Sequence, residues 1–373
     1  MNHAGVAPVP QRTADAMIQF AREAAESAYM EGHWYKQIEE LRTLAAGLIN
    51  VTREEIALVK NTSEGLGIVA GGVNWKEGDR IVTSAVEYPS NAYPWIDLSR
   101  RLGVELICVP ERVRGDGARI IDLAELLAAA DTPRTRMVTL SHVEFGSGFR
   151  NDLMAIGRFC RQRGILFCVD AIQSLGVLPL DAQAMNIDFL SADGHKWLLG
   201  PEGAGIFYCR RELIEHTHPP LIGWMNVVGA LDYDHIDFHL RADAGRFECG
   251  SWNVPGFLGL KASIELLQEE GLEAVTQRVK ILTDQLVSGL RGKGYAVVSA
   301  RDGESWSGIV SAVPPAGDPA AIAASLRKQR VEIAVRGGRL RFSPHFYNTE
   351  AQVDRVLSLL PPGKSGEFNI RSR

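Results

Sequence analysis

The sequence predicts an α/β fold with a mostly parallel β-sheet covered by helices, followed by a smaller α+β domain. Short apolar runs alternate with segments of helical period through the first two thirds of the chain. The runs are mostly apolar, which is typical of parallel strands buried between two layers of helices. After about residue 254 the pattern changes to long helices, and then to mixed short strands and helices.

Seven apolar runs are expected to form the strands of the sheet. They cover residues 56–60, 80–84, 104–109, 136–140, 165–169, 189–191 and 205–209. Between them, helical segments at residues 123–130 and 156–163 end near Pro133 and at Gly164, and these residue types commonly terminate helices. Residues 258–270 and 272–291 are expected to form the long helices that follow.

The length of the chain predicts two domains. It has 373 residues, whereas a single core stops growing at about 250–300 residues. We place the boundary where the pattern changes. The large domain is then residues 15–254, and the small domain combines residues 1–14 with residues 255–373.

Charge and composition exclude several classes of function. The net charge is −5, and lysines and arginines are scattered instead of forming the basic stripe that nucleic acids require. Residues 1–10 lack the pattern of a signal peptide, and no stretch reaches the ~18 apolar residues of a membrane span. We expect a cytoplasmic protein that binds neither nucleic acid nor membrane.

The cysteines and histidines give little support for a disulfide framework or a metal site. There are five cysteines, Cys108, Cys160, Cys168, Cys209 and Cys249, with no C-x-x-C pair. Cys108, Cys168 and Cys209 lie in apolar runs and are expected to be buried. Histidines occur at residues 216–218 and 232–239, but no second cluster completes a metal shell at a familiar spacing, so we expect no metal.

The most informative segment is residues 188–208, where a strand leads into a polar turn that carries Lys196. Lys196 is therefore expected at the carboxyl end of a strand, the edge where open α/β sheets bind ligands. A lysine in a confined pocket can lose its proton and attack a carbonyl as an amine. Taken alone, however, the pattern fits a surface lysine at a turn better.

Asp170 changes this interpretation because it ends another apolar strand upstream of Lys196. Pyridoxal 5′-phosphate (PLP) acts as an electron sink when its pyridine nitrogen stays protonated, and a carboxylate at a strand end can keep it so. Gln173, on the turn after that strand, could reach the phenolic oxygen of the ring. Without Lys196, Asp170 could equally be a helix N-cap; together the two residues predict PLP held by Lys196 as a Schiff base.

A phosphate site is expected where the strand at residues 56–60 meets Asn61-Thr-Ser-Glu. Backbone N–H groups and hydroxyls at a helix N-terminus bind phosphate. Ser63 and the amide of Glu64 are the candidates, although the same residues could form an ordinary capping box.

An alternative of another class is an NAD-dependent dehydrogenase. Gly65 and Gly67 match the pattern G-x-G-x-x-A, and Glu87 follows at the distance of a ribose-binding acid. Against this, four residues separate the strand from Gly65, whereas the dinucleotide fingerprint begins at the turn itself.

Over nearly its whole length the sequence resembles the class V aminotransferase family of PLP enzymes, which includes cysteine desulfurases, isopenicillin-N-epimerase-like proteins and kynureninases. The resemblance rests on Asn61-Thr-Ser-Glu, Glu87-Tyr-Pro-Ser-Asn, Ser141-His-Val, Val169-Asp-Ala-Ile-Gln, Asp193-Gly-His-Lys, Arg246-Phe-Glu-Cys-Gly-Ser and Arg341-Phe-Ser-Pro-His-Phe-Tyr-Asn-Thr. It implies a large domain like that of aspartate aminotransferase and a homodimer with shared active sites.

The resemblance also implies roles for single residues around the cofactor. Lys196 would form the Schiff base, Asp170 would pair with the pyridinium and Gln173 would touch the phenolic oxygen. Ser63 and His195 would hold the phosphate, and Ser251 would reach the phosphate of the partner subunit.

Three further residues complete the implied site. Tyr88 would stack on the face of the cofactor, and His142 would lie near its phenolic side as a catalytic residue. Arg341 would grip the substrate carboxylate, a task suited to its bidentate guanidinium.

Two positions depart from the cysteine desulfurase pattern. Desulfurases carry a catalytic cysteine in a mobile loop before the arginine, but residues 335–340 contain none, which argues against persulfide chemistry. Asp193 stands where desulfurases have a phosphate-binding serine. Because a carboxylate would repel the phosphate, we expect Asp193 to turn away or to bond to a neighbouring donor.

These residues predict chemistry at the α-carbon of an amino acid bound to the cofactor as an external aldimine. The displaced Lys196 would move the α-proton as a general base. The overall pattern is closest to the aminotransferase and isopenicillin-N-epimerase-like branch, and a PLP-dependent C–S lyase is the alternative. The sequence leaves the amino acid itself open.

Overall fold

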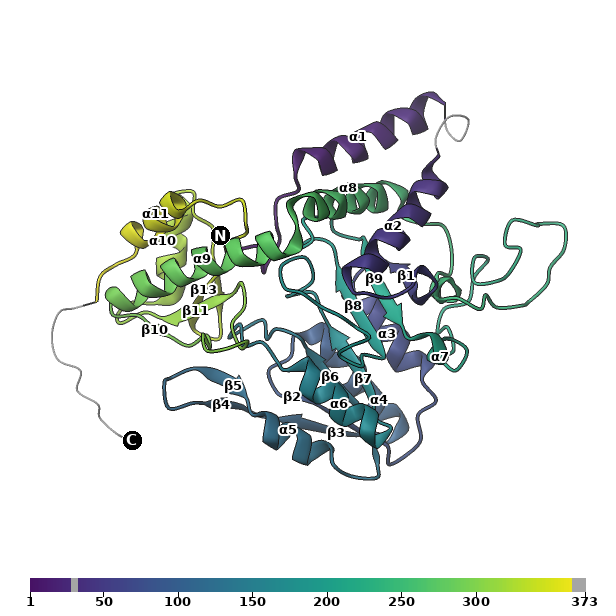
Figure 1. The fold of residues 1–373 in the computed structure, drawn as a ribbon, viewed down its shortest axis with the longest axis horizontal. Coiled ribbons are helices and arrows are strands. Elements are labelled where there is room, and N and C mark those ends of the chain that lie inside the picture. The colour runs from purple at the N-terminus through teal and green to yellow at the C-terminus, as the bar shows by residue number, and fades with distance from the viewer. Residues whose placement is uncertain (28–32, 364–373) are drawn as a thin grey trace.

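A seven-stranded sheet forms the centre of the larger part of the molecule in the computed structural model, which describes residues 1–27 and 33–363 (Figure 1). Its strands are β1 (Ile56–Val59), β2 (Arg80–Ser84), β3 (Glu105–Val109), β6 (Thr135–Ser141), β7 (Leu166–Asp170), β8 (Phe189–Asp193) and β9 (Gly205–Cys209). The strand order is β1-β9-β8-β7-β6-β2-β3, and only the contacts of β9 with β8 and β1 are antiparallel. The predicted mostly parallel sheet is confirmed, and each of the expected strands forms.

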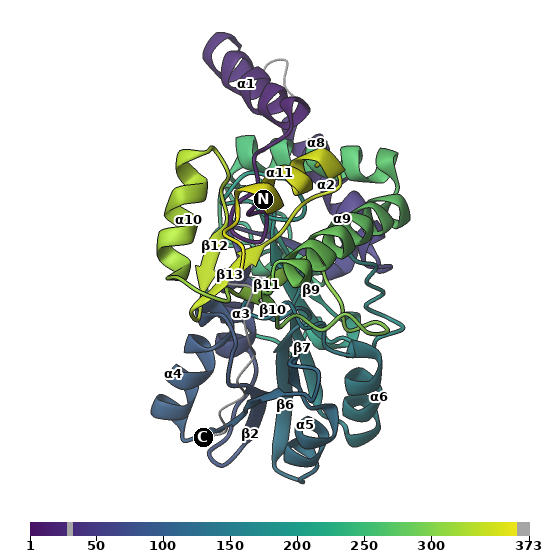
Figure 2. The ribbon, with the colours of Figure 1, turned by 90° about the vertical axis from the view of Figure 1, so that its left-hand side faces the viewer.

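Helices cover both faces of this sheet (Figure 2). They are α2 (Trp34–Leu48), α3 (Thr62–Gly72), α4 (Tyr93–Leu102), α5 (Leu123–Ala130), α6 (Leu153–Arg163) and α8 (Val254–Glu270). Neighbouring strand residues point to opposite faces. Ile81 therefore packs in the core that contains α3 and α4, whereas Val82 packs in the core that contains α2, α5, α6 and α8. Burial on both faces explains why the strands read as continuous apolar runs.

The smaller part is an α+β unit, as the sequence predicts. Strands β10 (Ala296–Val297), β11 (Val310–Val313), β12 (Ala334–Arg336) and β13 (Arg339–Phe342) form an antiparallel sheet in the order β10-β11-β13-β12. Helices α10 (Pro319–Lys328), α11 (Glu350–Leu359) and the second half of α9 (Leu272–Gly292) share one core with this sheet.

The packing of α8 and α9 bears on the domain boundary. Leu260 and Ile264 of α8 belong to the core of the large sheet, and so does Val275 early in α9. The core of the small sheet begins at Leu282. We therefore propose a boundary within α9, later than the one expected at residue 255.

The N-terminal segment links the two parts. Asn2 forms a β-bridge with Ser343, just after β13. Helix α1 (Gln11–Glu26) lies along α8 (Figure 1). Residues 1–14 thus contact both parts, and not only the small sheet.

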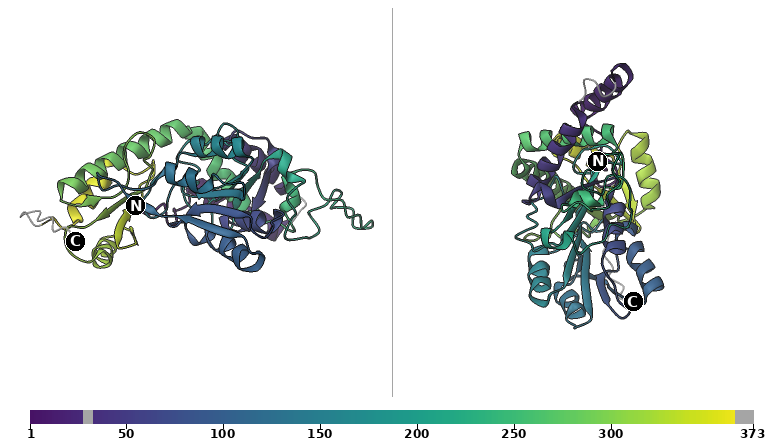
Figure 3. Two further views of the ribbon diagram at one scale, coloured as in Figure 1. Left: turned by 90° about the horizontal axis from the view of Figure 1, so that it is seen from below. Right: turned by 90° about the vertical axis from the view of Figure 1, so that its right-hand side faces the viewer.

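Some local features differ from the sequence-based expectation. The hairpin of β4 (Glu111–Val113) and β5 (Arg119–Ile121) was not predicted. Cys108 is exposed, because β3 is the edge strand of the large sheet; Cys168 and Cys209, on inner strands, are buried as expected. After the short helix α7 (Arg211–Ile214), a long loop projects from the body (Figure 3). Among the described helices, none has the length and apolar character needed to span a membrane.

Candidate active site

Four predicted site residues follow strands whose carboxyl ends meet at one edge of the large sheet. Asp170 ends β7, Lys196 follows β8 and Tyr88 follows β2. Ser63 follows β1, which runs parallel to β8 because β9 is antiparallel to both. This edge is where open α/β sheets bind ligands. The fold therefore brings together side chains that are far apart in the sequence.

A cavity of about 400 Å³ lies at this edge, between the large sheet and the β12–β13 hairpin. Seven of the predicted site residues line it: Ser63, Tyr88, Asp170, Gln173, His195, Lys196 and Arg341. Ala4, Gly5 and Val6 complete part of its wall. Glu64, His142 and Ser251 are not among the lining residues.

Lys196 is buried, with 7% of its surface exposed, and its Nζ lies 5.4 Å from the centroid of the Tyr88 ring. Burial lowers the pKa of Lys196 to about 8, an effect that Asp170 opposes and the guanidinium of Arg341 reinforces. With this pKa about a tenth of the amine is neutral at pH 7, far more than for an exposed lysine. It can therefore act as a nucleophile or accept a proton.

Asp170 is 1% exposed at the end of β7. Its Oδ1 accepts the backbone N–H of Ile172 at 3.0 Å, and its other oxygen has no hydrogen-bond partner among the described residues. Burial raises the pKa of Asp170 to about 6, partly offset by the Ile172 bond and by Lys196. Above that pH the cavity contains a carboxylate with one oxygen free for a cationic partner.

The first turn of α3 brings the Ser63 hydroxyl to the cavity. The Ser63 hydroxyl donates to Ser90 Oγ at 2.8 Å, and both residues line the cavity. The structure does not bring the Glu64 amide into the cavity, because Asn61 caps the helix and its Oδ1 accepts that N–H at 2.9 Å. Ser63 remains a candidate for the phosphate, whereas the expectation for Glu64 has to be corrected.

Asp193 and His195 form a close pair beside these donors. Asp193 Oδ2 lies 3.1 Å from Nδ1 of His195. The backbone N–H of Asp193 donates to Thr62 Oγ1 at 3.0 Å. Asp193 lines the cavity and does not turn away from it, and its contact with His195 is not a hydrogen bond, so neither of the two outcomes expected for it is observed. A protonated imidazole between this carboxylate and a phosphate would offset their repulsion.

Gln173 is fixed by two hydrogen bonds at the side of the cavity. Its Nε2 donates to the carbonyl oxygen of Ala4 at 3.0 Å, and its Oε1 accepts the indole N–H of Trp197 at 3.1 Å. A primary amide carries two N–H groups, so one donor of Gln173 is not used by these bonds.

Arg341 is 1% exposed and has no acidic partner among the described residues. Its Nη1 donates to the carbonyl oxygen of Phe145 at 2.8 Å, while its Nε makes no hydrogen bond. Burial and the nearby Arg336 lower the pKa of Arg341 to about 10. A buried guanidinium without a carboxylate is suited to binding an anion from outside the chain.

Sequence reasoning missed several parts of the cavity wall, among them Arg336 and residues 4–6. A signal for Arg336 was present, because Gly337-Gly338 is a typical two-residue hairpin turn that folds residue 336 back beside the strand of Arg341. Residues 4–6 reach the site only through tertiary contacts with Gln173 and Ser343, for which the sequence carries no local signal.

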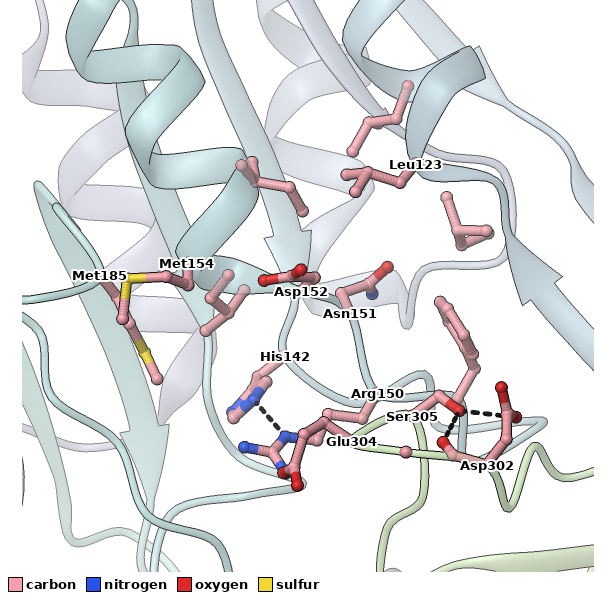
Figure 4. A pocket seen from close by; sticks show the side chains of 16 residues that line it. Leu123, His142, Arg150, Asn151, Asp152, Met154, Met185, Asp302, Glu304 and Ser305 are labelled. Carbon is pink, nitrogen blue, oxygen red and sulfur yellow. Dashed lines mark hydrogen bonds and ion pairs between the residues drawn. The ribbon is translucent and has the colours of Figure 1, made fainter.

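His142 faces a different cavity, of about 410 Å³, which also contains Met154 and Met185 (Figure 4). Its Nε2 accepts Arg150 Nε–H at 3.2 Å. The chain turns after β6, with the His142 N–H bound to the Asp170 carbonyl oxygen, and the ring lines this second cavity. The expectation that His142 is catalytic therefore has no support from its position.

Ser251 is exposed on a surface depression that also contains Lys60 and Trp252. It lies outside the cavity of its own chain. A role at the phosphate of a partner subunit, implied by the resemblance, stays a prediction.

The residues of the dinucleotide pattern have other tasks. A Cβ at Gly65 would lie 2.2 Å from Ser191 Oγ, so this glycine permits close packing of α3 on β8. Glu87 is buried and accepts the backbone N–H and the hydroxyl of Ser141 at 2.7 and 2.6 Å. Neither residue lines the Lys196 cavity.

The donor set of the cavity fits PLP. Lys196 offers an amine, Asp170 offers a carboxylate oxygen without a partner, and Tyr88 offers an aromatic ring. The start of α3 and His195 lie at the same wall and suit a phosphate. An aldehyde, a ring nitrogen and a phosphate would each find a matching group.

Comparisons with known proteins agree with this geometry. The family model described as aminotransferase class V matches residues 1–356. A probable cysteine desulfurase of Methanothermobacter thermautotrophicus is 31% identical, over 95% of this chain and 91% of that protein. The cystine C–S lyase C-DES, solved with its reaction product cysteine persulfide, superposes with a TM-score of 0.89 at 26% identity, covering 97% of both chains.

A structure of a lysine variant of C-DES contains glycine covalently linked to the PLP cofactor. It is 25% identical, with a TM-score of 0.89, and covers 97% of this chain and 96% of that one. These relatives favour C–S cleavage over the aminotransferase and epimerase-like reactions that the sequence placed first. The dehydrogenase alternative finds no support among them. The chain belongs to the class V aminotransferase family and is an enzyme that uses pyridoxal 5′-phosphate.

Proposed function

We propose that the protein is a C–S lyase that eliminates a sulfur leaving group from the β-carbon of an α-amino acid. The proposal depends on a contrast between the similar proteins and the residues that line the Lys196 cavity. The similar proteins named above are a probable cysteine desulfurase and a cystine C–S lyase, yet no cysteine of the described chain lines the Lys196 cavity. Without a thiol to accept sulfur, direct elimination remains.

The chain's own residues support each part of this reaction. Bound PLP would stabilise negative charge at the α-carbon. The free amine of Lys196 would accept the α-proton. Asp170 would keep a proton on the ring nitrogen, and Arg341 would hold the carboxylate so that the α-C–H bond is fixed relative to Lys196.

A product assay tests the proposal. Purified holoenzyme incubated with sulfur-containing amino acids should release pyruvate and ammonia in equal amounts, together with a reduced sulfur product. Pyruvate is measured by coupling to lactate dehydrogenase. Keto acid that forms only when a second keto acid is added as amino acceptor would show transamination and overturn the proposal, and so would a change of α-carbon configuration without pyruvate.

The pKa of Lys196 predicts how cofactor uptake depends on pH. This pKa is lowered to about 8, and only the neutral amine reacts with an aldehyde. The rate of PLP incorporation into the cofactor-free protein should rise about tenfold per unit between pH 6 and 7 and level off above about pH 8. The rate is followed by the visible absorbance of the bound cofactor. A rate that still rises at pH 10 would contradict the lowered pKa.

We also propose that two copies of the chain form a homodimer with shared active sites. Several large apolar side chains of the projecting loop are exposed: Leu231 by 73%, Tyr233 by 75%, Phe238 by 62% and Ile236 completely. Soluble monomers rarely expose such a group. Together with the family resemblance and the exposed position of Ser251, this supports a second copy of the chain as the partner that covers the loop.

Light scattering coupled to gel filtration checks the dimer. The protein should have twice the mass of one chain, and the double variant Ile236→Asp with Phe238→Asp should have the mass of a single chain. Val113→Asp is the matched control, because Val113 is 62% exposed but lies on the β4–β5 hairpin. A wild-type protein that runs as a single chain at micromolar concentration would refute this proposal.

A further inference from the structure

The wall of the Lys196 cavity where the phosphate is expected also carries a carboxylate. Ser63, in the first turn of α3, lines the cavity together with His195 and Asp193. The backbone N–H of Asp193, the last residue of β8, donates to Thr62 Oγ1 at 3.0 Å and joins β8 to the same turn of α3. A phosphate held by Ser63 and His195 would therefore lie beside the Asp193 carboxylate.

Two buried polar atoms of this wall have no hydrogen-bond partner among the described residues. They are Oδ1 of Asp193 and Nδ1 of His195. The Asp193 side chain is 5% exposed, and its Oδ2 lies 3.1 Å from Nδ1 of His195 without forming a hydrogen bond. Little water reaches this carboxylate to screen its charge. The chain thus holds a buried carboxylate against a ring nitrogen and provides neither of these two atoms with a hydrogen bond.

No cation of the described chain is committed to Asp193. Lysines and arginines form neither a hydrogen bond nor an ion pair with Asp193 or with His195. Burial lowers the pKa of Lys196, and the charges of Asp170 and Asp193 oppose this effect. Lys196 is, however, the predicted partner of the cofactor aldehyde, and Arg341 is the predicted partner of the substrate carboxylate. His195 is therefore the group that could carry a charge between Asp193 and a phosphate.

The elements around Asp193 bring no further cation into contact with it. Strand β9 places Gly205 opposite Asp193, and residues 4–7 of the N-terminal segment have no charged side chain. At the start of α3, the Glu64 carboxylate lies 3.7 Å from the amine of Lys60 in an ion pair. Two more charged residues of the described chain line the cavity without a hydrogen bond or ion pair to Asp193: Arg336 of β12 and the exposed Glu202.

A neutral imidazole cannot donate to two anions at once. It carries one N–H, and its other ring nitrogen presents a lone pair. With Asp193 beside Nδ1, a phosphate bound by the same ring meets Nε2. If Nδ1 carries the hydrogen, Nε2 presents its lone pair to the phosphate; if Nε2 carries it, Nδ1 presents its lone pair to Asp193. Only the imidazolium form has an N–H on both nitrogens and a positive charge between the two anions.

We propose that binding of the cofactor phosphate is coupled to the uptake of one proton from solvent, which His195 carries as an imidazolium between the phosphate and Asp193. Asp193 is then a positioning residue. It touches none of the reacting atoms but sets the protonation state of the side chain that holds the phosphate. The inference rests on the predicted phosphate site at Ser63 and His195, and it is independent of which bond the enzyme cleaves.

The proposal fixes the direction of the pH dependence. Phosphate affinity should fall as the pH rises, because the complex holds one proton more than the separate partners. A free imidazole is mostly neutral above about pH 7, and a phosphate ester is a dianion above about pH 6. Each unit of pH from about 7 to 8.5 should therefore weaken binding by up to about tenfold. The covalent step at Lys196 has the opposite pH dependence, so non-covalent binding has to be measured by itself.

The probe is 4′-deoxypyridoxine 5′-phosphate, which has the ring and the phosphate of the cofactor but no aldehyde to react with Lys196. It is titrated into the cofactor-free protein at pH 8 in two buffers with different enthalpies of ionisation, and the difference in heat counts the protons taken up. The wild type should take up about 0.5–1 proton more than His195→Gln, because an amide can donate a hydrogen bond but does not take up a proton. Equal counts would overturn the inference.

The variant Asp193→Asn separates the carboxylate from the imidazole. It should bind the probe about tenfold more tightly than the wild type at pH 8.5, because the repulsion between carboxylate and phosphate is removed. Its proton count should fall to less than about half, and the gain in affinity should vanish at pH 6, where the imidazolium already offsets the carboxylate. A variant with the proton count and pH dependence of the wild type would show that Asp193 has no part in the coupling.

Glu202→Gln is the matched control, since it removes a carboxylate from the same cavity. Because Glu202 is exposed, the change should leave the proton count and the affinity unaltered. Melting temperatures of the cofactor-free proteins identify any variant that fails to fold. Phosphorus NMR of the wild-type complex supplies a measurement without mutation. The bound phosphate should have the chemical shift of a dianion at pH 8, and the shift of a monoanion would place the proton on the phosphate and overturn the role of His195.

None of these measurements involves turnover, so this inference and the proposed function can fail separately. Proton uptake without pyruvate release from any sulfur-containing amino acid supports the Asp193–His195 coupling and refutes the lyase function. Pyruvate release by a protein that binds the probe without taking up a proton supports the lyase function and refutes the coupling.

Discussion

Replacing Lys196 by alanine is expected to reduce pyruvate release at least about 10³-fold. The variant loses both the amine that carries the cofactor and the base that takes the α-proton, and general acid–base catalysis alone contributes about 10²- to 10⁴-fold. The visible absorption of the covalently held cofactor should disappear as well. Borohydride reduction followed by peptide mass spectrometry should find the cofactor on residue 196 in the wild type and on no lysine in the variant.

A surface lysine provides the control for this change. Lys328 is exposed on α10, in the smaller α+β unit. Lys328→Ala should retain wild-type activity, absorption and melting temperature. If Lys196→Ala kept the absorption band, another amine would carry the cofactor and the assignment of Lys196 would fail.

Replacing Asp170 by asparagine should have the next largest effect, a loss of about 10²- to 10³-fold in kcat. The change keeps the shape of the side chain but removes the charge that would pair with the protonated ring nitrogen. Loss of one partner of a buried ion pair costs about 3–5 kcal/mol. Steady-state rates and the dissociation constant of PLP measure the loss.

Without cofactor, the Asp170→Asn variant should not be less stable than the wild type. Burial raises the pKa of Asp170 from 3.8 to about 6, so ionising this carboxyl group destabilises the folded apoprotein increasingly between these two pH values and fully above pH 6. Removing it should leave the melting temperature of the apoprotein unchanged or higher at pH 8. Because the raised pKa makes the cost appear as pH increases, any gain should vanish at pH 4. A variant that fails to fold would show a lower melting temperature at both pH values.

The sequence predicted the sheet well because its signal is local. A strand buried on both faces is mostly apolar, as β1 and β9, which are buried at every position, illustrate. Asp170 and Lys196 could be found by the same reasoning, since Asp170 ends one such run and Lys196 lies on the turn after another. Their proximity then depends only on which strand ends meet at one edge.

The features that the sequence did not predict depend on the direction in which a side chain points or on contacts between distant segments. His142 follows β6 at the correct edge, but the turn of the chain after that strand sends its ring into another cavity. The Glu64 N–H donates to the side chain of Asn61, the N-cap of α3. Residue spacing alone does not distinguish such a cap from a phosphate contact. Arg336 required the register of the β12–β13 hairpin, and residues 4–6 required the N-terminal segment to cross to the site.

The turn between β12 and β13 limits how this enzyme could evolve toward sulfur transfer. Gly337 and Gly338 both adopt left-handed backbone conformations, which cost other residues roughly 1–2 kcal/mol each. A point mutation to cysteine there would place a strained thiol on a rigid two-residue turn that cannot swing toward a substrate. Acquiring a sulfur relay at this place would require an insertion that lengthens the chain, a rarer genetic event than a single base change.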